Sequence, residues 1–258
     1  MTAAVEARGL GKQYGRRWAL SECTLSIPAG RWMAMKLALI GLAAMATTGL
    51  LSLMLSWWTS PLYQAAQKAA GPNALSISRF TPPLFGANGV APIGYAAFAF
   101  ALGVSVGVLI RRTLPAMAIT LAVFAAIQIL WPSFVRPHLI APLHATQALG
   151  AVSFDGIGDF GNGHLLLNVS SVSGMTGDWI TASHPVKATG QIVGMVPQAC
   201  ASINANFLQC LAGHGVRIAI SYQPASRYWT FQWLETGIFL VLALGLGGVC
   251  YWRVRRVT

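Results

Sequence analysis

Few residues of this chain have the types and spacing that catalysis requires. The histidines are scattered, at positions His138, His144, His164, His184 and His214, without a His-x-x-x-His spacing, and no Cys-x-x-Cys pair occurs. No metal site is therefore expected. Asp155 and Asp159 could form a pair of carboxylates, but the glycine-rich sequence around them favours solvated turn residues. We expect neither hydrolytic chemistry nor a cofactor.

A more unusual group of side chains precedes the last apolar run: Arg227, Trp229, Gln232 and Glu235. At helical spacing we expect Trp229, Gln232 and Glu235 to lie on about one face, with the aromatic side chains in a belt at a membrane interface. Ionisable residues at such positions are either functional or reach water. Glu235 is interpreted as an interfacial anchor that pairs with Arg227 or a backbone group, and this cluster is the candidate functional site.

Two of the four cysteines, Cys200 and Cys210, share one polar segment. If that segment lies outside the cell, where disulfides persist, the two could be bridged. The sequence leaves both the bridged and the reduced state open.

The composition is that of an integral membrane protein. Of the 258 residues 55% are apolar and only 9% are charged, whereas about a quarter of a soluble domain is charged. The net charge is +11, but the basic residues lie beside apolar runs and form no stripe interleaved with aromatics. Membrane lipid rather than nucleic acid is the expected counter-charge.

Three transmembrane helices are predicted in the first half of the chain, at 37–57, 92–110 and 114–131. The second and third are separated only by Arg111, Arg112 and Thr113. As one helix, the stretch 90–132 would be about twice the hydrocarbon thickness of a bilayer, and each arginine at its centre would cost about 2.5 to 3.5 kcal/mol. The stretch is therefore a helical hairpin with both arginines at its tip.

The remaining segments divide in the same way. The proline-rich stretch 58–91 is predicted to be an outer loop, since its prolines are too many for a continuous helix. Residues 133–232 alternate short apolar segments with turns and predict an extracytoplasmic domain, with strands near 164–172, 191–196 and 216–222. Residues 233–258 form the fourth transmembrane helix and a basic tail. The fold class is an α-helical polytopic membrane protein, with a strand-rich domain between its third and fourth transmembrane helices.

Small residues indicate where helices pack closely. Gly103 and Gly107 form a G-x-x-x-G pair on one face of the second helix, which permits the backbone of a neighbouring helix, in this chain or across a dimer, to approach. On the first helix, Gly41 and Ser52 belong to a similar face of small side chains.

Orientation follows from the basic residues. With both termini in the cytoplasm, most of the 17 lysines and arginines lie inside, including a set expected to fix topology and contact lipid: Arg111, Arg112, Arg253, Arg255 and Arg256. The opposite side carries fewer basic residues over much longer segments. The positive-inside rule favours this arrangement.

Residues 1–36 differ from the rest and form a predicted cytoplasmic segment, with strands at 5–10 and 20–27. The words RGLGKQYGRRWALSECTLSIPAGR resemble the opening of ATP-binding-cassette ATPases over residues 5–31, and Tyr14 matches the aromatic that stacks on adenine there. The G-x-x-x-x-G-K-[ST] loop that holds the phosphates in this family is absent from the chain. We therefore expect no ATP hydrolysis, and two strands without a partner sheet are not expected to fold alone.

A second resemblance covers the chain from about residue 31 onward. The phrases MKLALIGLAAMATTGLLSLMLSWW, RFTPPLFGANGVAPIGYAAFAFALGVSVGVLIRRTLPAMAIT and VRPHLIAP are similar to the permease subunits of bacterial ATP-binding-cassette transporters. The resemblance implies a multi-pass protein of the bacterial cell membrane that pairs with a separate ATPase subunit and forms a homo- or heterodimer of permeases. The family has six spans, so the four here would correspond to its third to sixth, joined in frame to a truncated ATPase near residues 30–32.

The resemblance thus implies a permease subunit of an export-type transporter. The alternative is a membrane-anchored extracytoplasmic binding or sensor protein that transports nothing. The apolar helices do not indicate which substrate is transported.

The predicted orientation is testable with reporter fusions. A reporter that is active only outside the cell is expected to work when fused after Pro142 and to fail when fused after Arg112, because these positions flank one span. Enzyme activity in intact cells is the measurement, with immunoblots as the control for expression. The reverse pattern of activity would show that the chain is inverted.

Overall fold

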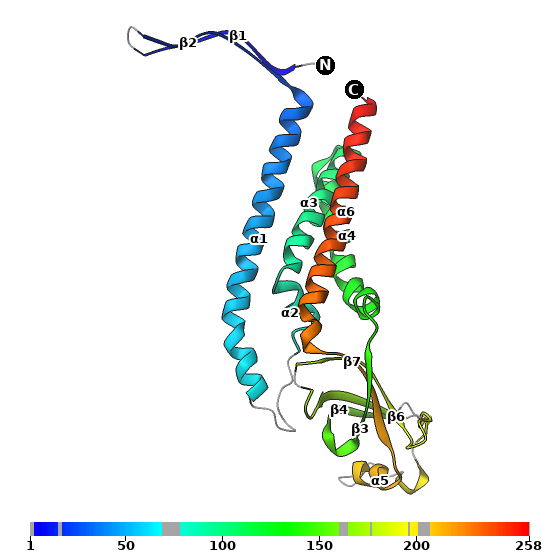
Figure 1. The fold of residues 1–258 in the computed structure, drawn as a ribbon. Coiled ribbons are helices and arrows are strands. Elements are labelled where there is room, and N and C mark those ends of the chain that lie inside the picture. The colour runs from blue at the N-terminus through cyan, green and yellow to red at the C-terminus, as the bar shows by residue number, and fades with distance from the viewer. Residues whose placement is uncertain are drawn as a thin grey trace.

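The computed structural model describes residues 3–14, 17–68, 78–159, 165–175, 177–195, 197–200 and 207–257. Within these residues four long helices have the length and composition to cross a membrane. The strand-rich region lies at one end of the helices and both chain termini lie at the other (Figure 1). The prediction of a polytopic helical protein with strands between its third and fourth spans is confirmed in this form.

The first long helix, α1 (Ala29–Lys68), is longer than predicted. The expected outer loop from residue 58 is wrong at its start, because the helix continues through Pro61. Proline has no N–H, so it removes one helical hydrogen bond to the carbonyl of Trp57, close to the end of the apolar segment. The remaining hydrogen bonds maintain the helix beyond Pro61 as far as Lys68. A short helix, α2 (Pro82–Ala87), begins with proline at its first position, where the missing N–H costs little.

The predicted hairpin is formed by α3 (Ala91–Ile110) and α4 (Thr113–Leu130). Arg111 closes α3 in the left-handed conformation at φ 55°, and its N–H donates to the carbonyl of Gly107 at 3.0 Å. Both Arg111 and Arg112 are exposed. The two arginines therefore lie at the tip, as predicted.

Beyond α4 the α-helix gives way to two short helical turns of other types. A π-helical turn (Trp131–Val135) and a 3-10 turn (Arg136–His138) follow without a break. These turns bury Pro132 and Arg136. The last helix, α6, spans Tyr228–Val257. The predicted domain boundary at residue 232 therefore lies inside a helix, because the polar and aromatic residues before the apolar run already belong to α6.

Among its described residues, the strand-rich region contains two sheets. One is antiparallel with the order β3-β7-β6, formed by β3 (Leu143–Ala148), β7 (Arg217–Gln223) and β6 (Trp179–Val186). The other pairs β4 (Val152–Asp159) with β5 (Leu165–Val172). Two of the predicted strands correspond to β5 and β7. The predicted strand at 191–196 is reduced to a bridge at Ile192, next to a turn in which Gly190 has φ +84°.

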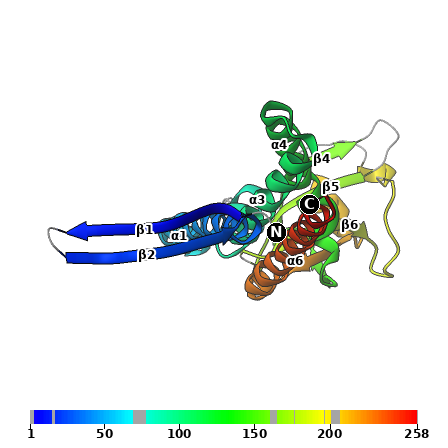
Figure 2. The ribbon, with the colours of Figure 1, turned by 90° about the horizontal axis from the view of Figure 1, so that it is seen from above.

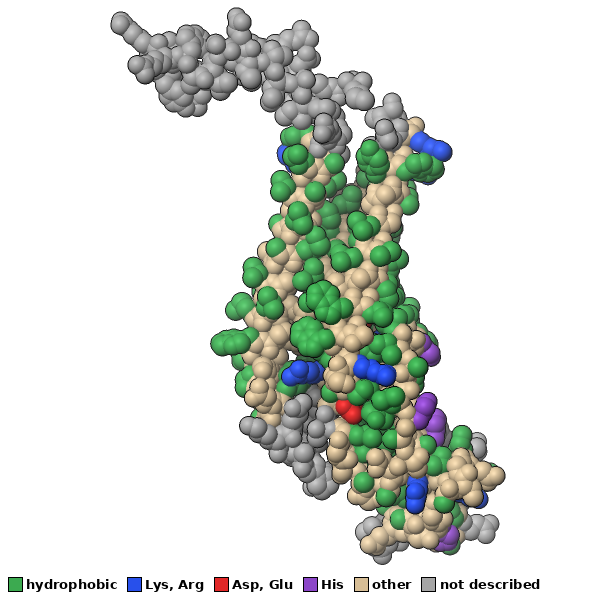
Figure 3. All heavy atoms as spheres, viewed as in Figure 1, with side chains coloured by type: hydrophobic (Ala, Val, Ile, Leu, Met, Phe, Trp, Pro, Cys, Tyr) green, Lys and Arg blue, Asp and Glu red, His purple; other side chains and the backbone are tan. Residues whose placement is uncertain are grey.

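Each part has its own apolar core. Between the two sheets and α5 (Phe207–Gly213) lies a cluster of buried side chains that includes Val169, Leu211 and Ile218. A second cluster, rich in aromatic rings, joins α2, α3 and α6 and includes Phe85, Phe98, Tyr95, Phe231 and Phe239. Away from these cores the helices present apolar side chains outward, as Figure 3 shows for one face. This surface is suited to lipid.

α3 is the central helix, in contact with α1, α4 and α6 (Figures 1 and 2). α3 and α6 approach closely at Gly94, where a Cβ atom would lie 3.0 Å from Cα of Thr236 on α6. The predicted glycine pair packs less closely. A Cβ atom at Gly103 would lie 3.7 Å from Thr120 on α4, and one at Gly107 would meet nothing within 4 Å. Within this chain only Gly103 of the pair therefore faces a neighbouring helix. A contact of the two glycines across a dimer stays a prediction.

The amino-terminal segment forms a hairpin of β1 (Ala3–Tyr14) and β2 (Arg17–Pro28). Both predicted strands occur and are longer than expected. The hairpin projects away from the start of α1 (Figures 1 and 2). Its side chains, Tyr14 among them, are outside the described part of the structure.

The α3–α6 contact gives a direct test of packing. Gly94→Ala places a methyl group against backbone that cannot move independently, so we expect a loss of about 1–3 kcal/mol in stability. The measurement is the unfolding midpoint of the purified protein in detergent. Gly107→Ala, the matched control, adds the same atom in open space and should leave the midpoint unchanged or raise it. Equal loss in both variants would contradict the packing at Gly94.

Candidate functional site

Glu235 is the centre of a buried polar cluster at the end of the helices that faces the strand-rich region. Its side chain is fully buried. Arg136 donates from Nε to Oε2 and from Nη2 to Oε1, each at 3.0 Å. The hydroxyl of Tyr95 donates to the same Oε1. The three residues come from α6, the turn after α4, and α3, so the cluster joins three helices at one point.

Two neighbouring groups complete the environment of Arg136. Its guanidinium lies over the ring of Phe85, 3.9 Å from the centroid. Nη2 also lies 3.4 Å from the hydroxyl oxygen of Tyr95. Arg136 is only 1% exposed. A guanidinium placed in this way is fixed by a planar ring on one side and a bidentate carboxylate at its edge.

The electrostatics of the cluster depend on pairing. A buried carboxylate or guanidinium alone is costly because it has lost its water, whereas the pair is neutral overall. The carboxylate accepts from two N–H groups and one hydroxyl, so its lone pairs are well occupied. The arrangement suits holding helix ends together, and it contains no activated nucleophile.

Gln232, one turn before Glu235, connects α6 to the start of α3. Its Oε1 accepts from the N–H groups of Val90 at 3.0 Å and Ala91 at 2.7 Å. These are groups that a helix start leaves without an intrahelical acceptor. Its Nε2 donates to the carbonyls of Phe85 at 3.2 Å and Asn88 at 3.1 Å, so the amide is used at both ends.

The loop that meets Gln232 requires glycine at position 89. Gly89 has φ +78°, and a Cβ atom there would lie 2.8 Å from the side chain of Gln232. The carbonyl of Gly89 also accepts from the hydroxyl of Ser52 on α1 at 2.7 Å. Through this loop α1 is joined to the same polar network.

The predicted cluster is only partly brought together. Gln232 and Glu235 are buried, but Trp229 is 55% exposed and points away from them. At about 100° per residue, positions 229 and 235 lie about 120° apart around the helix, too far for one face. The expected pairing of Glu235 with Arg227 is also wrong. Arg227 donates instead to the carbonyl of Ala141 and to Oε1 of Gln223, both at 2.9 Å.

Sequence reasoning missed Arg136 and Tyr95. A signal was present, because a lone carboxylate at the start of an apolar helix needs a cation, and Arg136 follows directly after the third apolar run. Nothing in local spacing links the residues, since 99 positions separate Arg136 from Glu235.

The turn between α3 and α4, which contains Arg111 and Arg112, and the carboxyl end of α6 lie toward the end of the helices that carries the termini (Figure 1). Arg111, Arg112, Arg253 and Arg256 are exposed, and the guanidinium of Arg256 lies 3.9 Å from the centroid of the Trp252 ring. The side chain of Arg255 is outside the described residues.

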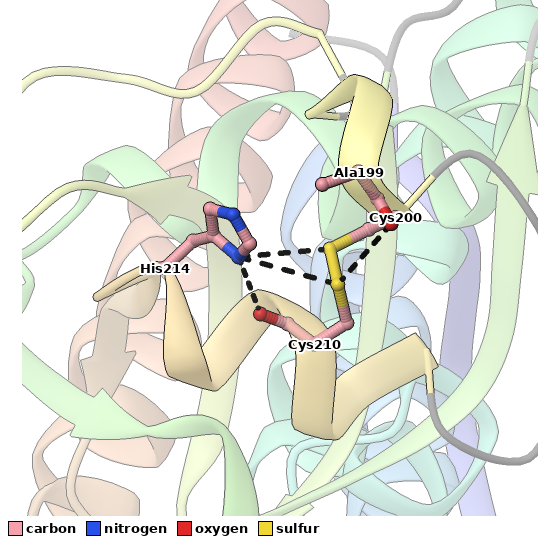
Figure 4. The surroundings of a disulfide bond; sticks show 4 residues. All are labelled: Ala199, Cys200, Cys210 and His214. Carbon is pink, nitrogen blue, oxygen red and sulfur yellow. Dashed lines mark hydrogen bonds between the residues drawn. A yellow bond between two sulfur atoms is a disulfide. The ribbon is translucent and has the colours of Figure 1, made fainter.

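Cys200 and Cys210 form a disulfide in the strand-rich region (Figure 4), with a Cα–Cα distance of 5.9 Å. Nδ1 of His214 lies 3.8 Å and 4.0 Å from the two sulfurs and 2.9 Å from the carbonyl oxygen of Cys210. The three side chains are close enough together to hold a metal ion. Sulfurs joined to each other are not thiolate ligands, however, and the short contact to the carbonyl favours a proton on Nδ1. The arrangement is a disulfide with the imidazole of His214 beside both of its sulfurs.

The other candidate residues remain apart. His138, His144 and His184 are exposed, and none belongs to a metal-binding group among the described residues. The side chains of Asp155, Asp159 and His164 lie outside the described part of the chain. The buried cluster of Tyr95, Arg136, Gln232 and Glu235 is therefore the candidate functional site.

The buried ion pair can be tested by a double-mutant cycle. Arg136→Met or Glu235→Leu alone leaves one buried charge unpaired and is expected to cost about 3–5 kcal/mol, whereas the double variant should recover much of that loss. Unfolding in detergent is the measurement. Arg227→Met, which removes a half-buried arginine with hydrogen bonds to neutral groups, serves as the control and should cost less. A double variant that is no more stable than either single variant would show that the loss of stability does not come from breaking the ion pair.

Comparison with known proteins gives one family match, whereas neither curated proteins nor solved structures match the chain. The matched segment, residues 21–136, is a little less than half of the chain and runs from within β2 to Arg136. It begins before the junction expected at residues 30–32, and nothing in the comparisons supports the ATPase resemblance of residues 5–31. The matched family is described as ABC-2 membrane transporter related, so residues 21–136, which contain α1, α3 and α4, are similar to ABC-2 type permease subunits.

Proposed function

We propose that this chain is a membrane-spanning permease subunit of an ATP-binding-cassette export-type transporter, driven by a separate ATPase in the bacterial cell membrane. The observation that carries the proposal is the family match over residues 21–136. It covers α3 and the three helices α1, α2 and α4, each of which packs against α3. The chain would supply part of the transport path and leave ATP hydrolysis to its partner.

Both termini would lie in the cytoplasm and the strand-rich region outside. Two features support this orientation. The exposed arginines Arg111, Arg112 and Arg253 lie toward the end with the termini, as the positive-inside rule requires of the cytoplasmic side. The disulfide between Cys200 and Cys210 lies in the strand-rich region, and disulfides persist in oxidising compartments.

The buried cluster would make the outer ends of the helices move together. Arg136, Glu235 and Tyr95 join α3, α6 and the turn after α4, and Gln232 joins α6 to the start of α3. ATP binding by the partner would shift a dimer of permeases between inward-open and outward-open states. With their outer ends joined, these helices would respond as one body.

One observation favours a second candidate, a membrane-anchored extracytoplasmic binding or sensor protein. The strand-rich region has its own apolar core, formed around Leu211, Ile218 and Ile220, and a stabilising disulfide. A region that is stable in itself could bind a ligand without any transport.

Co-purification separates the two functions. An ATPase encoded beside this chain is expected to co-purify with it and to hydrolyse ATP faster when both are reconstituted in proteoliposomes. The control is the same ATPase with an unrelated four-span protein. An ATPase that does not associate with this chain, or that hydrolyses ATP at the same rate without it, would contradict the permease function and favour the binding protein.

A further inference from the structure

A cleft of about 560 Å³ opens between α2, α3 and the end of α4. The α2 side is apolar and contributes Pro82, Pro83 and Ala87. The opposite side includes three side chains that can donate hydrogen bonds, from Gln128, Ser133 and Arg136. The hydroxyl of Ser133 makes a long bond, 3.4 Å, to the carbonyl of Ile129 and can turn from it to a bound acceptor. The lining is that of a site for a molecule with an apolar body and a polar acceptor.

Arg136 has a donor that the buried cluster does not use. Nε and Nη2 bind Glu235, whereas Nη1 is buried and has no hydrogen-bond partner among the described residues. An unpaired buried N–H of a charged group is costly, because it has lost its hydrogen bond to water and has no hydrogen-bond acceptor in the protein to replace it. Arg136 is part of the cleft lining, so the cleft is the space from which an acceptor would reach Nη1.

The charge around Arg136 selects the kind of acceptor. Glu235 neutralises the guanidinium at close range, so the site has no net positive charge to attract an anion. A neutral carbonyl oxygen accepts a hydrogen bond without adding an unpaired charge. An uncharged carbonyl therefore fits the donors better than a phosphate does.

The position of the cleft indicates where such a carbonyl comes from. The cleft lies where α4 gives way to the turn at Trp131, and its rim includes Ile129, which is 70% exposed on the apolar outer face. The exposed Trp229 and Trp233 lie at the start of α6, at the same end of the helices. Tryptophans of this kind mark the membrane interface. The ester groups of membrane lipids lie at the boundary between headgroup and hydrocarbon.

We propose that the cleft binds a glycerolipid of the surrounding membrane. An ester carbonyl accepts from Nη1 of Arg136, with Gln128 and Ser133 as further donors, and the adjoining acyl chain lies against Ala87 and Ile129. The lipid completes the hydrogen bonding of the buried cluster from the membrane side. The proposal does not require transport, so it stands or falls separately from the proposed function.

The test compares two lipids that differ only at the linkage. The delipidated full-length protein in detergent is titrated with dioleoyl phosphatidylcholine or with its diether analogue, which has the same headgroup and chains but no ester carbonyls. Bound lipid is counted by native mass spectrometry. The ester lipid is expected to bind about tenfold more tightly, the effect of one hydrogen bond from a charged donor. Equal binding of the two lipids would overturn the proposal and point to the phosphate.

Variants locate the site. Ala87→Phe fills the cleft and is expected to abolish the preference for the ester lipid, whereas Ala122→Phe, the same change at an exposed position on α4 outside the cleft, should retain it. Ser133→Leu, at an exposed position where folding is not threatened, provides a second test and should weaken binding of the ester lipid severalfold. An unchanged preference in both cleft variants would place the lipid elsewhere and overturn the assignment.

Discussion

The contact between Arg136 and Glu235 is the constraint on which the arrangement of the helices depends. A carboxylate at the start of an apolar helix must find a cation or water, and here the cation comes from the turn that ends α4. Once Glu235 faces inward, the rotation of α6 is fixed. Gln232 is then buried against the start of α3, and Trp229 is turned outward. A single ion pair thus determines which side of the last helix meets protein and which meets lipid.

The same contact links two parts of the chain that differ in their relationship to known proteins. The match to the ABC-2 membrane transporter related family includes Tyr95 and Arg136 but ends before the strand-rich region and α6. Glu235 lies beyond it. The polar cluster therefore ties the matched segment to the last helix, which lies beyond the match, and the strand-rich region lies in the sequence between the two ends of this contact.

The sequence was sufficient to predict features that depend on local physics. The four apolar helices follow from hydropathy over about twenty residues, and the hairpin at Arg111 follows from the cost of burying two arginines. The longer course of α1 was missed because one proline near a helix end removes one hydrogen bond and does not stop the helix. The partner of Glu235 could not be found, since pairing across 99 positions depends on how helices assemble. The disulfide remained open because it depends on the compartment.

The length of α1 has a mechanical consequence. The helix has 40 residues, which is about 60 Å at 1.5 Å per residue, against about 30 Å of hydrocarbon. Its apolar run, residues 37–57, matches that thickness, and the exposed Trp57 and Trp58 mark where the run ends. The turns of α1 beyond Trp58 therefore extend past the hydrocarbon as a rigid lever. The hydrogen bond from Ser52 to the carbonyl of Gly89 connects this lever to the buried cluster. A tilt of α1 in the bilayer is thereby passed to the helix ends that the cluster holds together.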